Sequence, residues 1–208
     1  MRNISFNIRG IGGPEKGRYL RDIIMKEEIY MACIQETKQI NITDEKCYAI
    51  WGDNNIEWTH HGSENGAGGI LCIWNKYSFC LSKSRSSKGF VILEGKWGVK
   101  RQPITIVNVY SPCAFNEKRI MWENIIKIRR QDQNKMWCML GDFNAIRNPS
   151  ERKGLSQMGI GRREIEEFNS FIESMELMDI PMIGRKFTWY RSNGIAKSRL
   201  DRALVSQE

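Results

Sequence analysis

The 208-residue sequence has no apolar run long enough to span a bilayer and no charged-then-apolar leader after Met1. A transmembrane helix needs about 20 mostly apolar residues, so we expect no membrane contact and an intracellular protein. The sequence also lacks an internal repeat, a low-complexity tract and any stretch typical of an interdomain linker. A chain of this length buries one substantial core, and we expect one domain over residues 1–208.

Cysteine and histidine patterns that bind metals are also absent. The six cysteines include no Cys-x-x-Cys pair, and several fall in apolar runs, where a thiol behaves as a small hydrophobe. We interpret them as reduced and structural, which excludes a disulfide framework and a zinc site. The only two histidines, His60 and His61, precede the glycine-rich stretch from Gly62 to Gly68, and we expect them to be exposed loop residues.

Basic residues exceed acidic ones by 32 to 24, which gives a formal net charge of +8. Clustered Lys and Arg displace the counterions around a phosphate backbone, so this balance favours DNA as the partner. The alternative for each basic cluster is an ordinary solvated surface. The most suggestive cluster follows Asn144 closely and contains Arg147, Arg152, Lys153, Arg162 and Arg163.

Short apolar and alternating runs predict more strands than helices. We therefore expect an α/β (α+β) fold of two sheets packed face to face with helices outside. Two closing strands, Lys186–Arg191 and Arg199–Val205, are expected to be joined by a turn containing Asn193-Gly194. Helices are expected through Leu20 to Ile24, over Glu117–Arg129, and from Ile165 to Met175, whose apolar stripe belongs to the core. The other expected strands are Asn3–Asn7, Tyr30–Ile34, Gly69–Trp74, Phe90–Leu93 and Ile104–Tyr110.

The most informative run, Met136 to Leu140, is apolar and stops at Gly141-Asp142-Phe143-Asn144. Open α/β proteins place reactive groups on the loops that follow buried strands. Residues i and i+2 of an extended chain point the same way, so the Asp142 carboxylate and the Asn144 amide are able to converge on one phosphoester. The alternative is an ordinary turn, because Gly, Asp and Asn are common at strand ends.

Polar residues stand at the ends of several predicted strands, which favours one site over a series of unrelated turns. Mg²⁺ prefers oxygen ligands, takes one or two protein carboxylates and keeps room for water and substrate phosphate. We therefore expect a Mg²⁺ site, in which Mn²⁺ substitutes, and no small-molecule cofactor. The strand-end residues are Asn7, Glu36, Tyr110, Asp142 with Asn144, and Asp201.

An ordered set of short motifs resembles the endonuclease/exonuclease/phosphatase superfamily, and within it the apurinic-type endonuclease domain of plant non-LTR (LINE-type) retrotransposons. The resemblance covers almost the whole chain. It implies a DNase I-like, four-layered α/β sandwich with two mainly antiparallel sheets. The motifs are Ser5-Phe6-Asn7-Ile8-Arg9-Gly10, Gln35-Glu36-Thr37-Lys38, Gly68-Gly69-Ile70-Leu71, Asn108-Val109-Tyr110-Ser111-Pro112, Gly141-Asp142-Phe143-Asn144, Phe187-Thr188-Trp189 and Ser198-Arg199-Leu200-Asp201-Arg202.

The resemblance implies a role for each strand-end residue. Glu36 would be the principal Mg²⁺ ligand, and the simplest alternative for it is an exposed acid beside Lys38. Asn7 would lie beside Glu36 and hold the metal shell or the phosphate, the alternative being an ordinary strand-end amide. Tyr110 would reach the scissile phosphate through its hydroxyl group. Asp142 would orient or deprotonate the attacking water, and Asn144 would hold a phosphate oxygen.

Three further assignments have simpler alternatives. Asp201 would be catalytic, although Arg199 and Arg202 offer it a plain salt bridge. Trp189, like Phe187, would lie near the nucleic acid, although alternating aromatic residues in a closing strand are more often core. Arg147 would bind substrate from its basic cluster.

Two departures from the family pattern accompany the match. The family ends with a Ser-Asp-His segment whose histidine assists phosphoryl chemistry, and we expect this chain to be truncated before that segment and before the final strand. Loss of a catalytic acid or base costs about 10² to 10⁴ in rate, so weak activity is expected. Arg9 occupies a position where a small acid or amide is frequent in the superfamily.

These observations predict a Mg²⁺-dependent endonuclease that hydrolyses DNA phosphodiesters, monomeric and nuclear. The first alternative is a catalytically inactive nucleic-acid-binding remnant that uses only the basic clusters. The second is a phosphatase acting on a phosphorylated small molecule or lipid, which the basic balance disfavours. The third, an ordinary α/β interaction domain, would require every motif match to be accidental.

Overall fold

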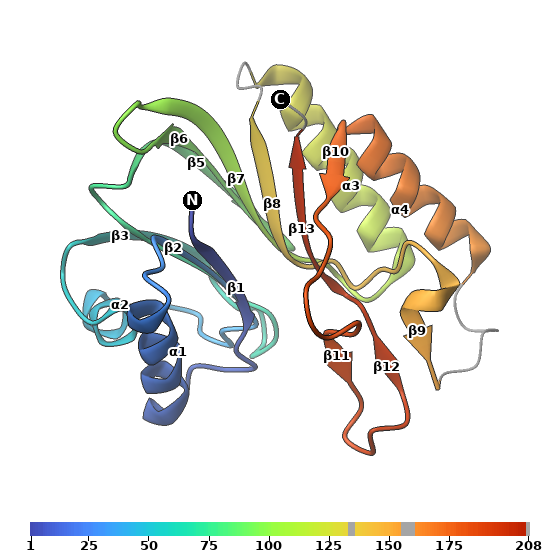
Figure 1. The fold of residues 1–208 in the computed structure, drawn as a ribbon, viewed down its shortest axis with the longest axis horizontal. Coiled ribbons are helices and arrows are strands. Elements are labelled where there is room, and N and C mark those ends of the chain that lie inside the picture. The colour runs from blue at the N-terminus through green and yellow to red at the C-terminus, as the bar shows by residue number, and fades with distance from the viewer. Residues whose placement is uncertain (133–135, 155–160, 207–208) are drawn as a thin grey trace.

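The computed structural model describes residues 1–132, 136–154 and 161–206 as two β-sheets packed face to face with helices on their outer faces (Figure 1). One sheet has four strands in the spatial order β1 (Asn3–Asn7), β2 (Met31–Gln35), β4 (Ile70–Asn75) and β3 (Ile56–His61). The other has six, in the order β10 (Leu177–Asp179), β13 (Asp201–Ser206), β8 (Trp137–Asp142), β7 (Gln102–Tyr110), β6 (Phe90–Trp97) and β5 (Phe79–Ser87).

Four helices and a small third sheet complete the described chain. The small sheet contains β11 (Trp189–Tyr190), β12 (Lys197–Ser198) and β9 (Arg152–Lys153). The α-helices are α1 (Pro14–Lys26), α2 (Asp44–Trp51), α3 (Phe115–Gln131) and α4 (Arg162–Ser174), and a 3₁₀ turn, η1, spans Pro149–Glu151. None of the helices described has the length and apolar character that a bilayer span requires.

The pairing pattern confirms the predicted sandwich of two mainly antiparallel sheets. Only the pairs β1–β2 and β7–β8 are parallel among the strand pairs that the structure describes. In Figure 1, α1 and α2 lie outside the four-stranded sheet, while α3 and α4 lie outside the six-stranded sheet. Both amphipathic helix pairs thereby cover an apolar sheet face, and the two inner faces cover each other.

Alternation along the strands decides which side chains face which layer. In β2, Ala32 and Ile34 pack with α1 and α2, while Met31 and Cys33 face the other sheet. In β8, Met139 packs with α3 and α4, while Cys138 and Leu140 face the other sheet. Because successive residues of a strand point to opposite faces, the side chain of every second residue is directed into the gap between the sheets.

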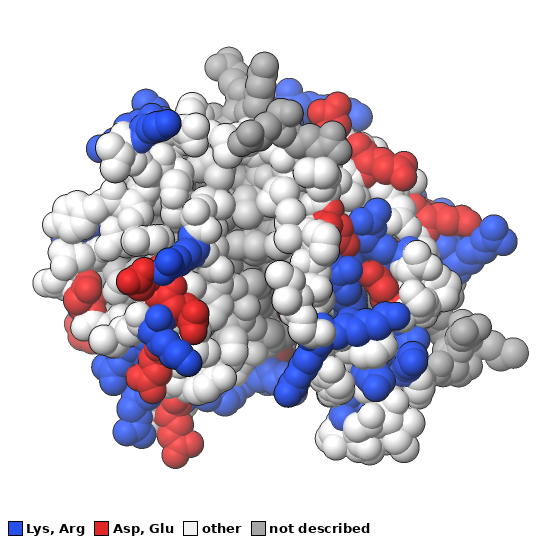
Figure 2. All heavy atoms as spheres, viewed as in Figure 1, with Lys and Arg blue, Asp and Glu red and all other residues white. Residues whose placement is uncertain are grey.

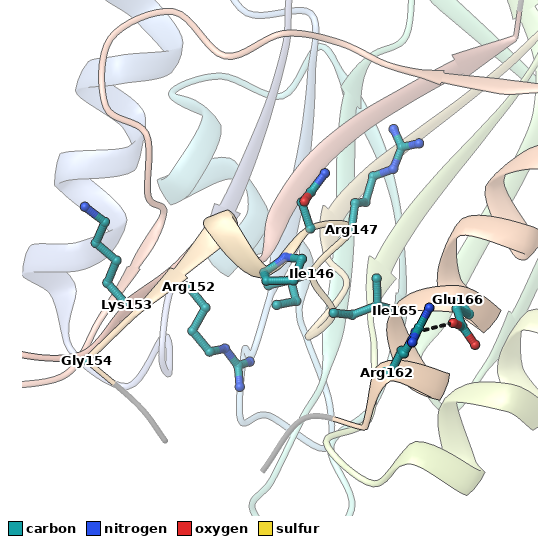
Figure 3. A pocket seen from close by; sticks show the side chains of 10 residues that line it. Ile146, Arg147, Arg152, Lys153, Gly154, Arg162, Ile165 and Glu166 are labelled. Carbon is teal, nitrogen blue, oxygen red and sulfur yellow. Dashed lines mark hydrogen bonds and ion pairs between the residues drawn. The ribbon is translucent and has the colours of Figure 1, made fainter. Parts of the chain in front are cut away.

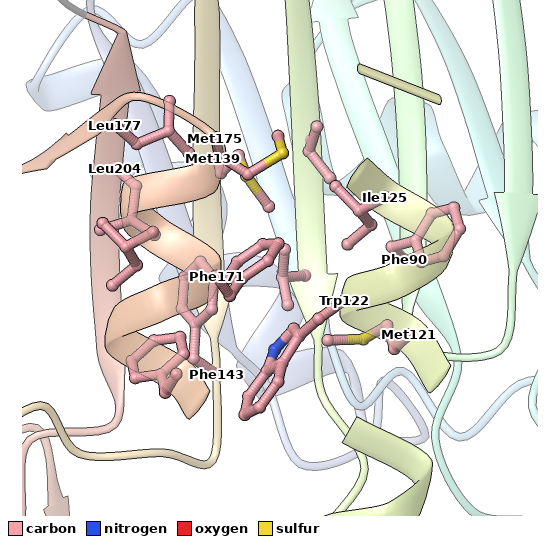
Figure 4. Close-up of a cluster of buried hydrophobic side chains, with 14 of the residues drawn as sticks. Phe90, Met121, Trp122, Ile125, Met139, Phe143, Phe171, Met175, Leu177 and Leu204 are labelled. Carbon is pink, nitrogen blue, oxygen red and sulfur yellow. The ribbon is translucent and has the colours of Figure 1, made fainter. Parts of the chain in front are cut away.

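The helix side of the six-stranded sheet is closed by aromatic packing (Figure 4). The Trp122 ring of α3 stacks on Phe168 and Phe171 of α4, with ring centroids 5.4 and 5.7 Å apart. Phe143, which directly follows β8, packs against Phe168 at 5.7 Å. The predicted assignment of the α4 stripe to the core is confirmed, and this packing fixes the segment that carries Asp142 and Asn144.

Besides the short elements η1, β9, β10 and β12, three longer elements were not predicted, namely α2, β3 and β5. The α2 helix begins at Thr43, whose side chain accepts a hydrogen bond from the Lys46 N–H, and ends at Gly52 in the left-handed conformation. The two strands are edge strands with many polar residues, and they form because β4 and β6 offer them backbone partners. The histidines are therefore not loop residues, since His60 and His61 pair with β4 inside β3.

The predicted closing hairpin was wrong in its second strand. The turn containing Asn193-Gly194 joins β11 to β12, which are two residues long each. The last strand, β13, begins at Asp201 and pairs instead with β8 and β10. The error matters for the site, because β13 brings Asp201 directly opposite Asp142.

A buried polar contact joins the two sheets below these strand ends. The Gln35 amide of β2 donates a hydrogen bond to Asn108 Oδ1 of β7 over 2.6 Å, and Asn108 Nδ2 donates to the Leu71 carbonyl over 3.0 Å. Both side chains are fully buried. Since buried polar groups are costly when unpaired, this contact fixes how the two sheets sit on each other.

Replacing Asn108 tests the importance of that contact. We expect Asn108→Leu to lower the free energy of unfolding by about 1 to 3 kcal/mol, because the Leu71 carbonyl loses its side-chain donor and the Gln35 amide loses one of its three acceptors in a dry environment. Urea unfolding measures the change, with Asn116→Leu at an exposed position of α3 as the control. An Asn108→Leu variant as stable as the wild type would show that the contact does not stabilise the sandwich.

Candidate metal and phosphoester site

The strand-end residues come together at one edge of the sandwich. Tyr110 and Asp201 are the register partners of Asp142 on its two neighbouring strands, β7 and β13. Asn7 ends β1 in the facing sheet, and its Nδ2 lies 3.4 Å from Asp142 Oδ2. The side chains of Tyr110, Asp142 and Asp201 all fall on the face of their strands that is directed toward the other sheet.

Asp142 is the most deeply buried carboxylate of the set, with 7% of its surface exposed. Its Oδ1 accepts a hydrogen bond from the Asn144 N–H over 2.9 Å, so the predicted turn interpretation is also correct in part. Burial, together with the negative charges of Asp201 and Glu36, raises the pKa of Asp142 to about 6 against hydrogen bonds from Asn144 and Asn7. An acid of this kind binds a proton more readily than an exposed aspartate does.

Asp201 and Tyr110 share the same environment. Burial raises the pKa of Asp201, although a hydrogen bond from the Thr188 hydroxyl opposes the rise. Burial and the carboxylates of Glu36 and Asp142 raise the pKa of Tyr110 to about 12, so its hydroxyl stays a donor at neutral pH. These charge effects put Glu36 and Asp201 within electrostatic range of Asp142.

Glu36 lies directly after β2, and the segment that follows it packs closely against Gly68 and Gly69. The Thr37 and Lys38 N–H groups donate hydrogen bonds to the carbonyls of Gly69 and Gly68 over 3.0 and 2.9 Å. A Cβ atom at Gly69 would stand 2.2 Å from Thr37 Oγ1, so no other residue fits there. The Glu36 carboxylate is 3.1 Å from the Lys38 ammonium, which is the partner predicted by the simplest alternative.

Four of the eight described non-glycine residues with a left-handed backbone lie around the same site. The non-glycine residues Arg9, Glu36, Lys38 and Asn144 have φ angles of 50°, 58°, 57° and 47°. A left-handed conformation costs a non-glycine residue about 1 kcal/mol or more, and such residues cluster at sites where function fixes a side chain. Four of them at the ends of β1, β2 and β8 therefore support a functional interpretation over ordinary turns.

Asn144 is held by contacts that its sequence position does not reveal. Its Nδ2 donates a hydrogen bond to the Ser111 carbonyl over 2.7 Å, which leaves its second amide hydrogen for another acceptor. Its carbonyl accepts from the Lys118 ammonium over 2.5 Å, and Lys118 also pairs with Glu164. A signal for Lys118 was present, since it is a charged residue on the apolar face of α3.

Thr188 is a second residue that the sequence analysis did not single out. Its Oγ1 accepts hydrogen bonds from the Leu200 and Asp201 N–H groups over 2.9 and 3.0 Å. Its hydroxyl group also donates a hydrogen bond to the Asp201 carboxylate, which lowers the pKa of Asp201. Trp189 follows Thr188 and is half-buried, whereas Phe187 is buried, as a core aromatic is expected to be. Substrate contact by Trp189 remains a prediction.

The predicted salt bridge between Asp201 and its neighbouring arginines is not formed among the residues described. Arg202 pairs with Glu151 and, over 2.6 Å, with Asp179, and Arg199 pairs with Asp179 over 2.7 Å. Arg202 and Asp201 are adjacent in a strand and point to opposite faces of the sheet. Asp201 thus lacks the partner that would have explained it without a site.

Arg147 contacts Asn169 and Asp179 and none of the strand-end residues described above. Its Nε donates to Asn169 Oδ1 over 2.8 Å, and its Nη1 lies 3.4 Å from Asp179 Oδ2. The residue also lines a separate basic pocket between β9 and α4 (Figure 3). Substrate binding by Arg147 remains a prediction and would take place in that pocket, whose other basic residues are Arg152, Lys153 and Arg162.

The donor set fits a hard divalent cation. The carboxylates of Asp201 and Glu36 lie within electrostatic range of Asp142, and their repulsion contributes to the raised pKa of Asp142. The residues described contain no compact cluster of three His, Cys, Asp or Glu side chains that would enclose a metal by itself. Mg²⁺ needs no such enclosure, because it usually keeps several water molecules and takes one or two carboxylates. Glu36 with Asn7 would provide that partial coordination.

Comparison with known proteins agrees with this fold. The model of the Endonuclease/Exonuclease/phosphatase family matches residues 4–208. The AP endonuclease LMAP from Leishmania major superimposes with a TM-score of 0.74 and 16% identity, covering 99% of this chain and 78% of that one. The Xenopus laevis APE2 catalytic domain superimposes with a TM-score of 0.75 and 16% identity, covering 100% of this chain and 82% of that one.

A third solved structure is the endonuclease domain of TRAS1, a telomere-specific non-LTR retrotransposon, with a TM-score of 0.70 and 14% identity over 99% of this chain and 85% of that one. At these identities the structural matches establish the fold, an α/β sandwich of the DNase I-like type. The family match spans nearly the whole sequence, including every strand-end residue described above. The chain therefore belongs to the endonuclease/exonuclease/phosphatase family.

Proposed function

We propose that this protein is a Mg²⁺-dependent endonuclease that hydrolyses phosphodiesters of the DNA backbone. The single observation that supports it most is the environment of Asp142, a buried carboxylate of raised pKa beside Asn7 and within range of Glu36 and Asp201. A net charge of +8 supports a polyanionic substrate. In Figure 2 the visible Lys and Arg side chains gather most densely at lower right, over the region of β9, β11 and β12 in Figure 1.

The residues divide the chemistry among them. Glu36 and Asn7 would hold Mg²⁺, which when bound polarises a phosphoryl oxygen. Asp142 would orient the attacking water and take its proton, as its raised pKa favours. Tyr110 would donate a hydrogen bond to a phosphate oxygen, and the second amide hydrogen of Asn144 would do the same.

The resemblance to retrotransposon endonucleases gives this proposal its finer form. We propose descent from a non-LTR retroelement of a plant, in line with the motif set and with the fold shared with the TRAS1 endonuclease domain. Substitution of Mn²⁺ for Mg²⁺, a monomeric state and a nuclear location stay predictions that accompany it.

Glu36→Gln tests the metal role. We expect the Mg²⁺ concentration for half-maximal nicking of supercoiled plasmid to rise by at least about 10- to 100-fold, the loss that even an outer-shell change at a metal site produces. Glu173→Gln, at an exposed position of α4, is the matched control. An unchanged Mg²⁺ requirement in Glu36→Gln would exclude Glu36 as the ligand.

One observation favours a second candidate, DNA binding without cleavage. The basic pocket between β9 and α4 collects four Lys and Arg side chains away from the strand-end carboxylates. Salt-dependent binding of a DNA duplex, with no nicking at any Mg²⁺ or Mn²⁺ concentration, would support this candidate over the endonuclease. Release of phosphate from a phosphorylated lipid or sugar would instead favour a phosphatase.

A further inference from the structure

Arg9 is an exposed residue whose backbone is held by several hydrogen bonds beside the site. Its φ angle is 50°, and its N–H donates to Asn7 Oδ1 over 3.3 Å. Its carbonyl accepts from the Lys16 ammonium over 2.8 Å, and the next N–H, that of Gly10, donates to the Glu36 carbonyl over 2.7 Å. The backbone of Arg9 is thus fixed between Asn7 and Glu36, the two residues that would hold the metal.

The Lys16 ammonium group holds the segment from Ile8 to Gly10 in place. Besides Arg9, its ammonium group binds the carbonyls of Ile8 and Gly10, over 3.0 and 3.3 Å, so it holds three successive carbonyls from the first turn of α1. A left-handed arginine is less favourable than a left-handed glycine, so these contacts hold a conformation that Arg9 itself disfavours. Strain maintained in this way points to a function for the side chain.

The guanidinium group of Arg9 is free to bind a ligand. Within residues 1–132, 136–154 and 161–206 it has no hydrogen bond or ion pair, and the residue is exposed. Its positive charge nevertheless reaches the opposite sheet, where it opposes the pKa rise that burial causes at Tyr110 and Asp201. Together with the position of the Arg9 backbone between Asn7 and Glu36, this charge effect puts the guanidinium within electrostatic range of the strand ends of the facing sheet.

We propose that Arg9 is a catalytic residue that binds the non-bridging oxygens of the scissile phosphate. This inference rests on the proposed function and adds to it a second positive charge beside the metal. A guanidinium group forms paired hydrogen bonds with phosphate oxygens and keeps its charge at all relevant pH values. A phosphodiester entering among Glu36, Asp142 and Asp201 meets carboxylate repulsion, and Arg9 offsets it as negative charge grows on the phosphoryl oxygens.

Arg9→Gly separates this role from a structural one. We expect kcat for plasmid nicking to fall by about 10² to 10³, as for loss of one preorganised donor, while KM changes far less. The melting temperature should stay equal or rise, because glycine accepts the left-handed conformation. Arg9→Lys should restore part of the rate, and Arg18→Met, at an exposed position of α1, should leave kcat unchanged.

A second readout does not depend on turnover. In the Asp142→Asn background with Mg²⁺, the NMR signal of the Arg9 Nε–H, assigned by its loss in Arg9→Gly, should shift on titration with a thymidine dinucleotide, while Arg18 should not respond. An unmoved Arg9 signal at saturating dinucleotide, or an Arg9→Gly variant with wild-type kcat, overturns the inference. Absence of nicking by the wild type would instead refute the proposed endonuclease, and the dinucleotide titration would still decide on Arg9.

Discussion

Asp142→Asn is expected to lower the rate of Mg²⁺-dependent DNA nicking by about 10² to 10⁴, the usual contribution of a positioned general base. The amide has nearly the same shape and retains an acceptor for the Asn144 N–H, so the loop after β8 should keep its conformation. What is lost is the ability to take a proton from water. Single-turnover nicking of supercoiled plasmid measures the effect, with Asp22→Asn on the exposed face of α1 as the control.

The same substitution should stabilise the metal-free protein. The pKa of Asp142 is about 6 in the folded chain against an ordinary value of 3.8, so the native state holds this proton more tightly than the unfolded state does. The free energy of unfolding therefore falls as the pH rises from about 4 to 6, by on the order of 2 to 3 kcal/mol. In EDTA at pH 8 Asp142→Asn should be more stable than the wild type by a similar amount, and the gain should vanish near pH 4.

A nicking rate within a factor of a few of the wild type would remove Asp142 from the catalytic set. Loss of both activity and stability would indicate that the Asp142 carboxylate supports the fold instead. We expect a variant that loses activity and gains stability at pH 8. Only that combination matches a carboxylate whose pKa is raised by burial and by its neighbours, as proton transfer near neutral pH requires.

Arg202→Met should have the largest effect on stability. The Arg202 side chain is fully buried and pairs with both Glu151 and Asp179, beside the Phe168 ring at 5.7 Å. Breaking a buried ion pair by removing one partner costs about 3 to 5 kcal/mol, because the remaining charge loses its compensation. Since Arg199 still contacts both carboxylates, we expect the lower end of that range.

Thermal and urea unfolding measure this loss, and at about 2 to 4 °C per kcal/mol a fall in melting temperature near 10 °C is expected. Arg162→Met is the control, because Arg162 is exposed and its pair with Glu166 is a surface pair within α4. Burial alone would raise the pKa of Glu151, but contacts with Arg202 and others lower it below 4.5. The penalty should therefore be full above about pH 4.5 and shrink as the pH falls further. A stable Arg202→Met variant would show that Arg199 alone satisfies both acids.

The sequence predicted the strand ends that carry Glu36 and Asp142 better than the edges of the fold. Asp142 and Glu36 were identified because each ends an apolar run, and buried strands of that kind leave little choice of position. The strand β5 was missed, because Phe79–Ser87 is mostly polar and becomes a strand only through pairing with β6. Local patterns do not contain that partner, so an edge strand of this composition reads as a loop.

Long-range partners explain the remaining differences. The simpler alternative for Asp201 was a salt bridge with Arg202, its neighbour in sequence, but strand alternation turns the two side chains apart. Its actual partner Glu151 is 51 residues away, and no local pattern indicates such a contact. Thr188 was missed for the same reason, since its contacts with β13 come from another segment. Lys118 differs, because its charge on the apolar face of α3 was a local signal.

The most direct test of the central claim is a crystal structure of the protein soaked in Mn²⁺, with the metal located by its anomalous signal. Our account predicts one peak bound to the Glu36 carboxylate, in the gap between the ends of β2 and β8, which Glu36→Gln removes. A peak that is unchanged in Glu36→Gln, or a saturating soak whose metal binds only away from Glu36 and Asp142, would contradict it.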